Sequence, residues 1–167
     1  MRRGVLWLLA ALLLAGCAVP AVAVQEGDDA IKVRLLMDAM DEVGVCRPEQ
    51  AVDVWARGLI ERSAAMQYAV MTVSLREKYV ESLSKNAPNW VTGLSSPWVS
   101  GYTIEQVREP APDRRVYTVS VKTETSTGPA GKYSAVLSLR EENGFWRISG
   151  ISADDEMSVY TGFERLL

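Results

Sequence analysis

The sequence predicts an α+β domain, with helices in its first half and an antiparallel sheet of about four strands in its second half. Between residues 30 and 85, apolar side chains recur at spacings of three and four, which is the period of an amphipathic helix. Between residues 99 and 152 they recur at every second position, as in a strand with one buried face. Only short turns separate the strands, so we expect consecutive strands to pair as an antiparallel meander.

The first helix is expected to run from Ala30 to near Gly44, a residue type that commonly ends helices. Asp28 or Asp29 is expected to cap its start. The apolar positions that define its inner face are Ile31, Leu35, Met37 or Ala39, Met40 and Val43.

The second helix is indicated by Pro48 followed by Glu49, because a first-turn position tolerates both a missing amide hydrogen and a negative charge. This helix should lie across the sheet. Its apolar stripe consists of Val52, Trp55, Leu59 and Ile60.

A third helix is expected after Thr72, where residues 74–77, Ser-Leu-Arg-Glu, match the capping-box pattern. Leu75, Tyr79 and Leu83, at a spacing of four, form its inner edge. Residues 86–96 then break the helical pattern with proline, glycine and serine.

Four strands complete the expected domain: Val99–Val107, Val116–Thr125, Tyr133–Glu141 and Phe145–Ser152. Residues 110–113 should form a turn and residues 126–131 a longer loop. Asn143-Gly144 predicts a tight type I′ hairpin, because both residue types reach positive φ at low cost. The expected core-facing residues of this hairpin are Tyr133, Ala135, Leu137 and Leu139 on one strand and Trp146, Ile148 and Gly150 on the other.

The N-terminus has the pattern of an export signal. A short basic start precedes an apolar run, Val5–Leu14, that is too short to span a bilayer. Residues 14–17, Leu-Ala-Gly-Cys, closely resemble the lipobox of bacterial lipoproteins. This resemblance implies that residues 1–16 are removed and that Cys17 is acylated, which would hold the protein on a lipid bilayer, since two acyl chains anchor a protein durably. The alternative is an ordinary signal peptide with a chance cysteine.

Residues 17–29 are expected to be a tether, followed by a single domain over residues 30–163. With Cys17 acylated, Cys46 has no partner for an intrachain disulfide. The neighbouring Val43 and Val45 favour a small buried side chain at Cys46, although a reactive thiol beside Arg47 remains open.

The charge of the chain argues against a nucleic-acid partner. The chain has 18 basic and 21 acidic residues, and residues 1–16 contain two of the basic ones and none of the acidic ones. The mature charge is therefore 16 minus 21, or −5. Nucleic acids and anionic bilayers favour positively charged surfaces, so we expect neither as a partner surface for this domain.

A family resemblance rests on the order of the elements, on residues 48–52 opening a tryptophan-containing helix, and on the strand Asn-Gly-Phe-Trp-Arg-Ile at 143–148. Residues 46–153 resemble the NTF2-like (cystatin-like) superfamily, in which a curved sheet wraps around a long helix to form a cone. Within it, the chain looks most like small lipoproteins and membrane-tethered extracytoplasmic domains of Gram-positive bacteria, where the fold is commonly an accessory or sensing module. The resemblance also implies that a homodimer, if one forms, pairs through the outer face of the sheet.

Other NTF2-like members are enzymes that use carboxylates, tyrosines and often histidine inside the cone. This chain has no histidine, which removes the commonest base near neutral pH and the commonest metal ligand. Asp53 is the best acid–base candidate, with Tyr68 or Tyr102 as a hydrogen-bond donor. The competing interpretation makes Asp53 a solvated residue of the helix surface. We expect no catalytic residue, no metal site and no cofactor.

Aromatic residues are the remaining candidates for binding a partner or ligand. They are Trp90, Trp98, Tyr102 and Tyr117, with Tyr68 nearby, and we expect them to line the open end of a cone. Trp55 and Trp146 are assigned to core packing.

Three functional hypotheses follow, which the sequence alone does not separate. In the first, a non-enzymatic, membrane-anchored accessory domain docks an envelope protein or a cell-wall component. In the second, the cone carries or senses a small molecule. In the third, the domain is an enzyme with a carboxylate facing a pocket.

Overall fold

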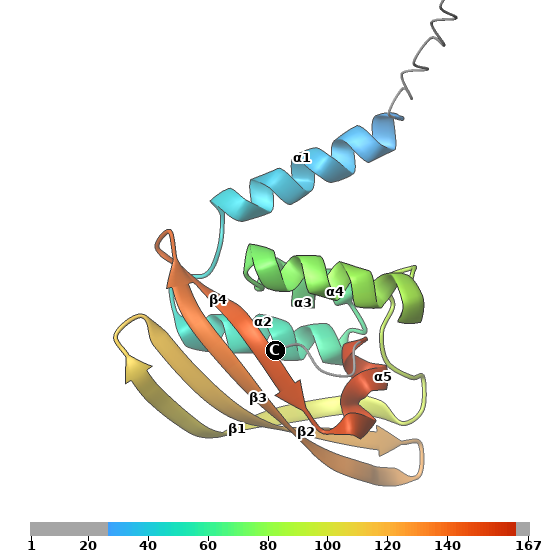
Figure 1. The fold of residues 1–167 in the computed structure, drawn as a ribbon. Helices are drawn as coiled ribbons and strands as arrows, with labels where there is room; N and C mark the ends of the chain where they lie inside the picture. The colour runs from blue at the N-terminus through green and yellow to red at the C-terminus, as the bar shows by residue number, and fades with distance from the viewer. Residues whose placement is uncertain (1–26, 163–167) are drawn as a thin grey trace, which may run out of the picture.

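The computed structural model describes residues 27–162, and Figure 1 shows the arrangement of its elements. The helices are α1 (Asp28–Glu42), α2 (Pro48–Ile60), α3 (Ala64–Ala69), α4 (Val73–Asn86) and α5 (Ser158–Thr161), with a 3₁₀ turn η1 (Asp155–Met157) before α5. The strands are β1 (Trp98–Ala111), β2 (Arg114–Thr125), β3 (Gly128–Glu142) and β4 (Phe145–Ala153). The predicted order of three helices followed by four strands is confirmed for α1, α2, α4 and β1 to β4, whereas α3, η1 and α5 are additions that the sequence patterns did not indicate.

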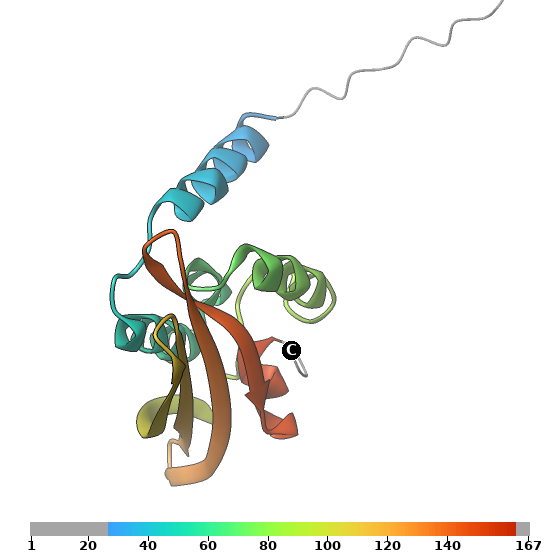
Figure 2. The same ribbon diagram turned by 60° about the vertical axis from the view of Figure 1, so that its left-hand side comes forward.

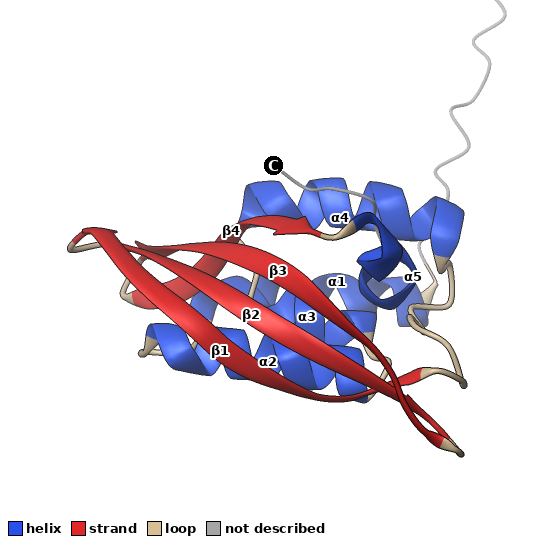
Figure 3. Cartoon of the chain, turned by 90° about the horizontal axis from the view of Figure 1, so that it is seen from below, coloured by secondary structure: helices blue, strands red, loops and turns tan. Residues whose placement is uncertain are grey.

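The four strands form one open antiparallel sheet in the order β1-β2-β3-β4. Helices α2, α3 and α4 cover one face of this sheet, as the view from below shows (Figure 3). The α+β class and the meander are therefore confirmed. The helices leave the other sheet face open, so the core is the single layer between them.

Core residues of neighbouring strands pair directly across the sheet. Tyr117 lies opposite Leu137, which in turn lies opposite Ile151, and all three are fully buried. Trp55 contributes the largest buried side chain from the helical layer and has 0% of its surface exposed. Trp146 is also buried, so the assignment of both tryptophans to packing is confirmed.

The β3–β4 hairpin turns at Asn143 (φ 53°) and Gly144 (φ 81°), as a type I′ turn requires. The predicted alternation is correct along β3 but wrong beyond Ile148 on β4. Ser138 pairs with Gly150 whereas Leu139 pairs with Ile148, so Ser149 is an extra residue, a β-bulge. The bulge shifts the side-chain alternation by one position, which places Ile151 rather than Gly150 in the core.

Two predicted turns are shorter than expected. Strand β3 begins at Gly128, and only residues 126 and 127 separate it from β2, because Thr125 pairs with Gly128 and the pairing continues to Gly131. The predicted loop over residues 126–131 is therefore wrong. The turn after β1 is likewise reduced to residues 112 and 113, since Ala111 pairs with Arg114.

Helix α4 is capped by Thr72, and the predicted capping box over residues 74–77 is wrong. The Thr72 Oγ1 accepts a hydrogen bond from the Leu75 amide at 3.4 Å. Ser74 already lies inside the helix, so Glu77 is too far along the chain to reach back to the capping residue.

We expect Thr72→Ala to lower the free energy of unfolding by about 1 kcal/mol, because it removes the side-chain acceptor from the first turn of α4. Ser74→Ala is the matched control, and its loss should be about 0.3 kcal/mol or less. Urea denaturation followed by circular dichroism measures both. A larger loss for Ser74→Ala than for Thr72→Ala would contradict this position of the cap.

Helix α1 projects away from the sheet and the other helices, with its C-terminal end nearest to them (Figures 1 and 2). None of its residues is fully buried. Its N-cap is Gly27, without a side-chain hydrogen bond, and Asp28 and Asp29 form its first turn. The prediction that one of these aspartates caps the helix is therefore wrong. Their charges instead face the positive end of the helix dipole.

Cys46 is exposed, so the prediction that it is a buried side chain is wrong. It lies in the short connection between α1 and α2. This connection is held to the sheet by its backbone, since the Trp146 amide donates to the Val45 carbonyl at 2.8 Å. Val43 beside that contact is exposed, whereas Val45 is partly buried against the core.

The predicted signal peptide, Cys17 and the tether up to residue 26 lie outside the described residues. Within residues 27–162, none of the helices combines the length and apolar character needed to cross a membrane.

Candidate functional site

A groove of about 470 Å³ separates the C-terminal half of α1 from α4. Its walls combine apolar side chains with charged ones, and its floor is the ring of Tyr68 from α3 together with the guanidinium of Arg76 from α4. The lining residues are Met37, Asp38, Asp41, Tyr68, Val73, Arg76, Glu77 and Val80. The groove therefore lies between the projecting helix α1 and the rest of the domain.

Arg76 is a buried arginine at the base of the groove, with 3% of its surface exposed. Its Nε donates to the Tyr68 carbonyl at 3.0 Å and its Nη2 to the Ala69 carbonyl at 2.9 Å, so it caps the C-terminal end of α3. Its Nη1 pairs with the Asp41 carboxylate of α1. The guanidinium carbon also lies 4.8 Å from the centre of the Tyr68 ring, a cation–π contact.

Arg147 of β4 is the second buried arginine, with 4% of its surface exposed. Its Nη2 donates to the carbonyls of Met40, Asp41 and Val43 at 3.2, 3.0 and 3.0 Å. These carbonyls belong to the C-terminal end of α1, where the helix leaves its last carbonyls without internal partners and carries partial negative charge. The two arginines therefore fasten α1 to the domain through its last turn.

The positive charges of the two guanidinium groups lie close enough to affect the pKa of Arg76. Burial lowers the pKa of Arg76, the neighbouring positive charge of Arg147 lowers it further, and the Asp41 carboxylate raises it. Burial raises the pKa of Tyr68, while Arg76 acts in the opposite direction. Because arginine loses its proton only at strongly alkaline pH, the fastening of α1 is expected to persist across the physiological range.

The structure brings together two of the five predicted aromatic residues. The rings of Tyr68 and Trp90 pack with their centres 5.3 Å apart and their planes tilted by 53°. Trp90 has a positive φ of 61°, and its carbonyl accepts from the Ala64 amide at 3.0 Å, at the start of α3. Tyr68 lines the groove, and Trp90 supports it from the α4–β1 connection.

Tyr102 and Tyr117 lie elsewhere, between the sheet and α2. The Tyr102 hydroxyl donates to Asp53 at 2.8 Å, and the Tyr117 hydroxyl donates to Glu49 at 2.9 Å. The two carboxylates are one turn apart on α2, so the two bonds attach this helix to β1 and β2 side by side. Trp98 is partly exposed at the start of β1.

Burial, together with the hydrogen bond to Asp53 and its charge, raises the pKa of Tyr102 from 10.0 to about 12. A folded-state pKa above the unfolded value stabilises the fold below pH 10, and this stabilisation is lost as pH rises from 10 to about 12. We expect Tyr102→Phe to remove an ionisation near pH 12 and to reduce the loss of stability over that interval. Ultraviolet absorbance titration of the two proteins measures the first effect, and urea denaturation at several pH values measures the second.

Asp53→Asn provides the control for this titration, because it keeps a hydrogen-bond acceptor but removes the charge. The pKa of Tyr102 should then fall part of the way toward its ordinary value. An unchanged titration in Asp53→Asn would contradict the contribution of the carboxylate.

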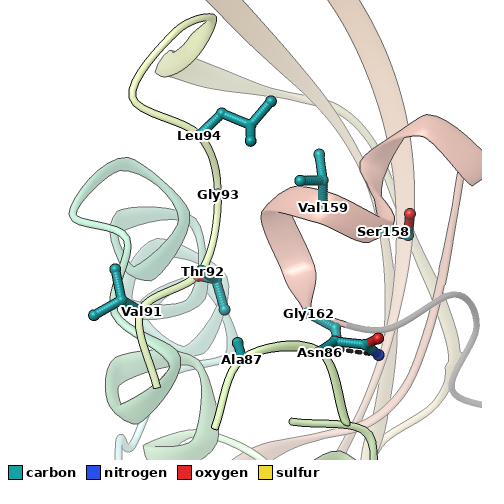
Figure 4. A pocket seen from close by; sticks show the side chains of 9 residues that line it. All are labelled: Asn86, Ala87, Val91, Thr92, Gly93, Leu94, Ser158, Val159 and Gly162. Carbon is teal, nitrogen blue, oxygen red and sulfur yellow. Dashed lines mark hydrogen bonds between the residues drawn. The ribbon is translucent and has the colours of Figure 1, made fainter. Parts of the chain in front are cut away.

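A second cavity, of about 390 Å³, lies between the α4–β1 connection and α5 (Figure 4). Its lining residues are Asn86, Ala87, Val91, Thr92, Gly93, Leu94, Ser158, Val159 and Gly162. No ionisable side chain is among them, so this cavity offers neither an acid–base pair nor a charged anchor. The groove between α1 and α4 is therefore the better candidate site.

The sequence patterns assigned no role to either buried arginine. Arg147 lies within an alternating strand at a position expected to face outward, and nothing in that pattern indicates its contacts with α1. Arg76 had a usable signal, since it precedes Tyr79 by three positions and Leu83 by seven and so shares the inner face of α4. Among residues 27–162, no cluster of three or more His, Cys, Asp or Glu side chains is arranged to hold a metal ion.

Comparisons with known proteins give structural neighbours only. No family model matches the sequence. No curated protein matches it either. A variant of Rv3472, a protein of unknown function from Mycobacterium tuberculosis, is similar in structure with 9% identity and a TM-score of 0.43, over 74% of each chain. The intermembrane space region of the chloroplast protein ARC6 is similar with 12% identity and a TM-score of 0.37, over 63% of this chain and 92% of that one. With TM-scores below 0.5, neither likeness assigns a family or a function.

Proposed function

We propose that this protein is a lipoprotein whose NTF2-like domain acts as a non-catalytic binding module at the cell envelope. Acylated Cys17 anchors the chain to the extracytoplasmic face of the membrane, and residues 17–27 and α1 carry the domain away from it. An envelope protein docks in the groove between α1 and α4. An α+β domain with an open antiparallel sheet and helices on one face of it is compatible with an NTF2-like cone.

The fastening of α1 is the observation that carries this proposal. A helix with no fully buried residue would leave the domain unless something held it, and here two buried arginines hold its last turn. The result is a fixed groove placed between the proposed membrane attachment and the core. A fixed concave surface binds a partner with less loss of conformational entropy than a mobile arm does.

The chemistry of the groove favours binding over catalysis. Its Asp41 carboxylate is neutralised by Arg76, and its remaining carboxylates are exposed at the rim. The Asp53–Tyr102 pair, which was the acid–base candidate, attaches α2 to the sheet and lies outside the groove lining. A small-molecule carrier is the second candidate, since a groove of about 470 Å³ falls within the size range of ligand pockets.

Expression of the full chain in a bacterial host, with metabolic labelling by an alkynyl palmitate analogue, tests the anchor. We expect the wild-type protein to take up the label and to sediment with membranes. Cys17→Ala should lose both properties, whereas Cys46→Ala, the matched control, should keep both. Label retained by Cys17→Ala, or wild-type protein found only in the cytosol, would refute the proposed anchoring.

A further inference from the structure

We infer that the groove between α1 and α4 binds an amphipathic helical segment that carries lysine or arginine beside its apolar stripe. This inference rests on the proposed binding function and identifies the chemistry of the partner. Three features of the groove support it: a helix on each side, apolar side chains on both walls, and carboxylates at both rims.

Each wall of the groove is one face of a helix. The lining residues span positions 37–41 of α1 and 73–80 of α4, which correspond to about one turn and about two turns. The α4 wall presents Val73, which is 52% exposed, and Val80, which is 37% exposed. The α1 wall presents Met37, and Val33 and Met40 share its helix face at spacings of four and three. Helical ligands bind such grooves through apolar residues at the same spacings.

The charges at the rims of the groove determine which sign of charge on a partner is attracted. Asp38 of α1 and Glu77 of α4 are both exposed and lie on opposite walls. Asp41 contributes little to the outer field because the buried guanidinium of Arg76 pairs with it. The lining therefore carries two negative charges besides that of Asp41. A segment with lysine or arginine on both sides of its apolar stripe matches these rims, and an acidic segment is repelled.

A second copy of this chain is a poor occupant. Helix α1 is its most exposed helix, and it contains five acidic and two basic residues. Placing it in an acidic groove would bring like charges together, which costs binding free energy. Helix α1 of a second copy is therefore excluded, and the proposed occupant is a segment of a different protein.

The test uses two synthetic fluorescent 14-residue peptides and the lipidated full chain in nanodiscs of zwitterionic lipid. One peptide has leucines at helical spacing with lysines on the other face, and its analogue has glutamates in place of the lysines. Fluorescence anisotropy, corrected with empty nanodiscs, measures binding. We expect the lysine peptide to bind at least about tenfold more tightly than the glutamate peptide, because two rim charges change from attraction to repulsion.

Charge-reversal variants locate the binding. Asp38→Lys with Glu77→Lys should weaken the lysine peptide about tenfold or more. Glu124→Lys with Glu141→Lys makes the same change in net charge at exposed positions of the sheet and should change the affinity by less than about threefold. Val80→Asp adds a test of the apolar wall and should also weaken binding. All changes are at exposed positions, and circular dichroism checks that each variant folds.

Equal weakening by the two double variants would overturn the inference, because it would show attraction to net charge alone. Absence of lysine-peptide binding by the wild-type protein, or equal binding of both peptides, would overturn it as well. The labelling of Cys17 is independent of these measurements. Failure of the peptide tests with intact labelling would thus reject the partner chemistry and leave the anchored domain in place.

Discussion

Replacing Arg76 with alanine is expected to lower the free energy of unfolding by about 3 kcal/mol. The substitution leaves the carbonyls of Tyr68 and Ala69 without their side-chain donor and removes the counterion of Asp41. It also removes one of the two arginine side chains that hold α1 against the domain. An isolated helix of about 12–15 residues is marginally stable in water, so the amides of α1 should lose protection from hydrogen exchange. Urea denaturation and hydrogen exchange with mass spectrometry measure the two effects.

Arg76→Lys separates charge from geometry. A lysine keeps the positive charge but cannot present the planar fork that reaches two helix ends, so about half of the loss should remain. Arg57→Ala is the control for removal of an arginine from a salt bridge. Arg57 pairs with Glu61 at 3.2 Å on the exposed side of α2, and its loss should cost about 0.5 kcal/mol or less. Unchanged hydrogen exchange of α1 in Arg76→Ala would show that Arg147 alone holds this helix.

Trp55→Ala is expected to have the largest effect on stability, with a loss of about 4 kcal/mol. Trp55 lies in the middle of α2 with none of its surface exposed, and its removal leaves a cavity between the helical layer and the sheet. Urea denaturation followed by far-ultraviolet circular dichroism measures the loss without depending on tryptophan fluorescence. A variant that fails to fold at all would agree with this expectation.

Trp55→Phe keeps the test quantitative if the alanine variant does not fold. The indole Nε1 of Trp55 has no hydrogen-bond partner among the described residues, so a phenyl ring should keep most of the packing, with a loss of about 1.5 kcal/mol. Trp98→Ala removes the same side chain from a partly exposed position and should cost clearly less than Trp55→Ala. Equal losses at both positions would contradict the central place of Trp55 in the core.

The elements that the sequence predicted well are those with strong local signals. In the predicted apolar stripe of α2, Val52, Trp55 and Leu59 are buried, whereas Ile60 at the end of the helix is exposed. The Asn143-Gly144 turn was placed correctly, because helix periodicity and positive φ are properties of adjacent residues. The end of β4 was misplaced because a bulge depends on the pairing of two strands. A single strand sequence does not reveal where its neighbour skips a residue.

Only part of the candidate site could be predicted from the sequence. Tyr68 was singled out from the sequence and lines the groove, but the expected cluster of aromatics is divided between the groove side and the α2–sheet interface. Asp53 and Tyr102 were named as partners and do form a hydrogen bond, which serves to position a helix. The buried arginines act on residues distant in the chain. Arg76 contacts Asp41, and Arg147 contacts carbonyls more than 100 positions away.

The sequence by itself determined the α+β class, the order of α1, α2, α4 and the four strands, and the hairpin turn, since these follow from local periodicity and backbone preference. Tertiary structure alone decided that Cys46 is exposed, that β4 contains a bulge and that α1 is fastened by Arg76 and Arg147. Each of these features depends on which distant segments come together. Buried charges must find partners wherever the fold provides them, and a linear pattern does not record those partners.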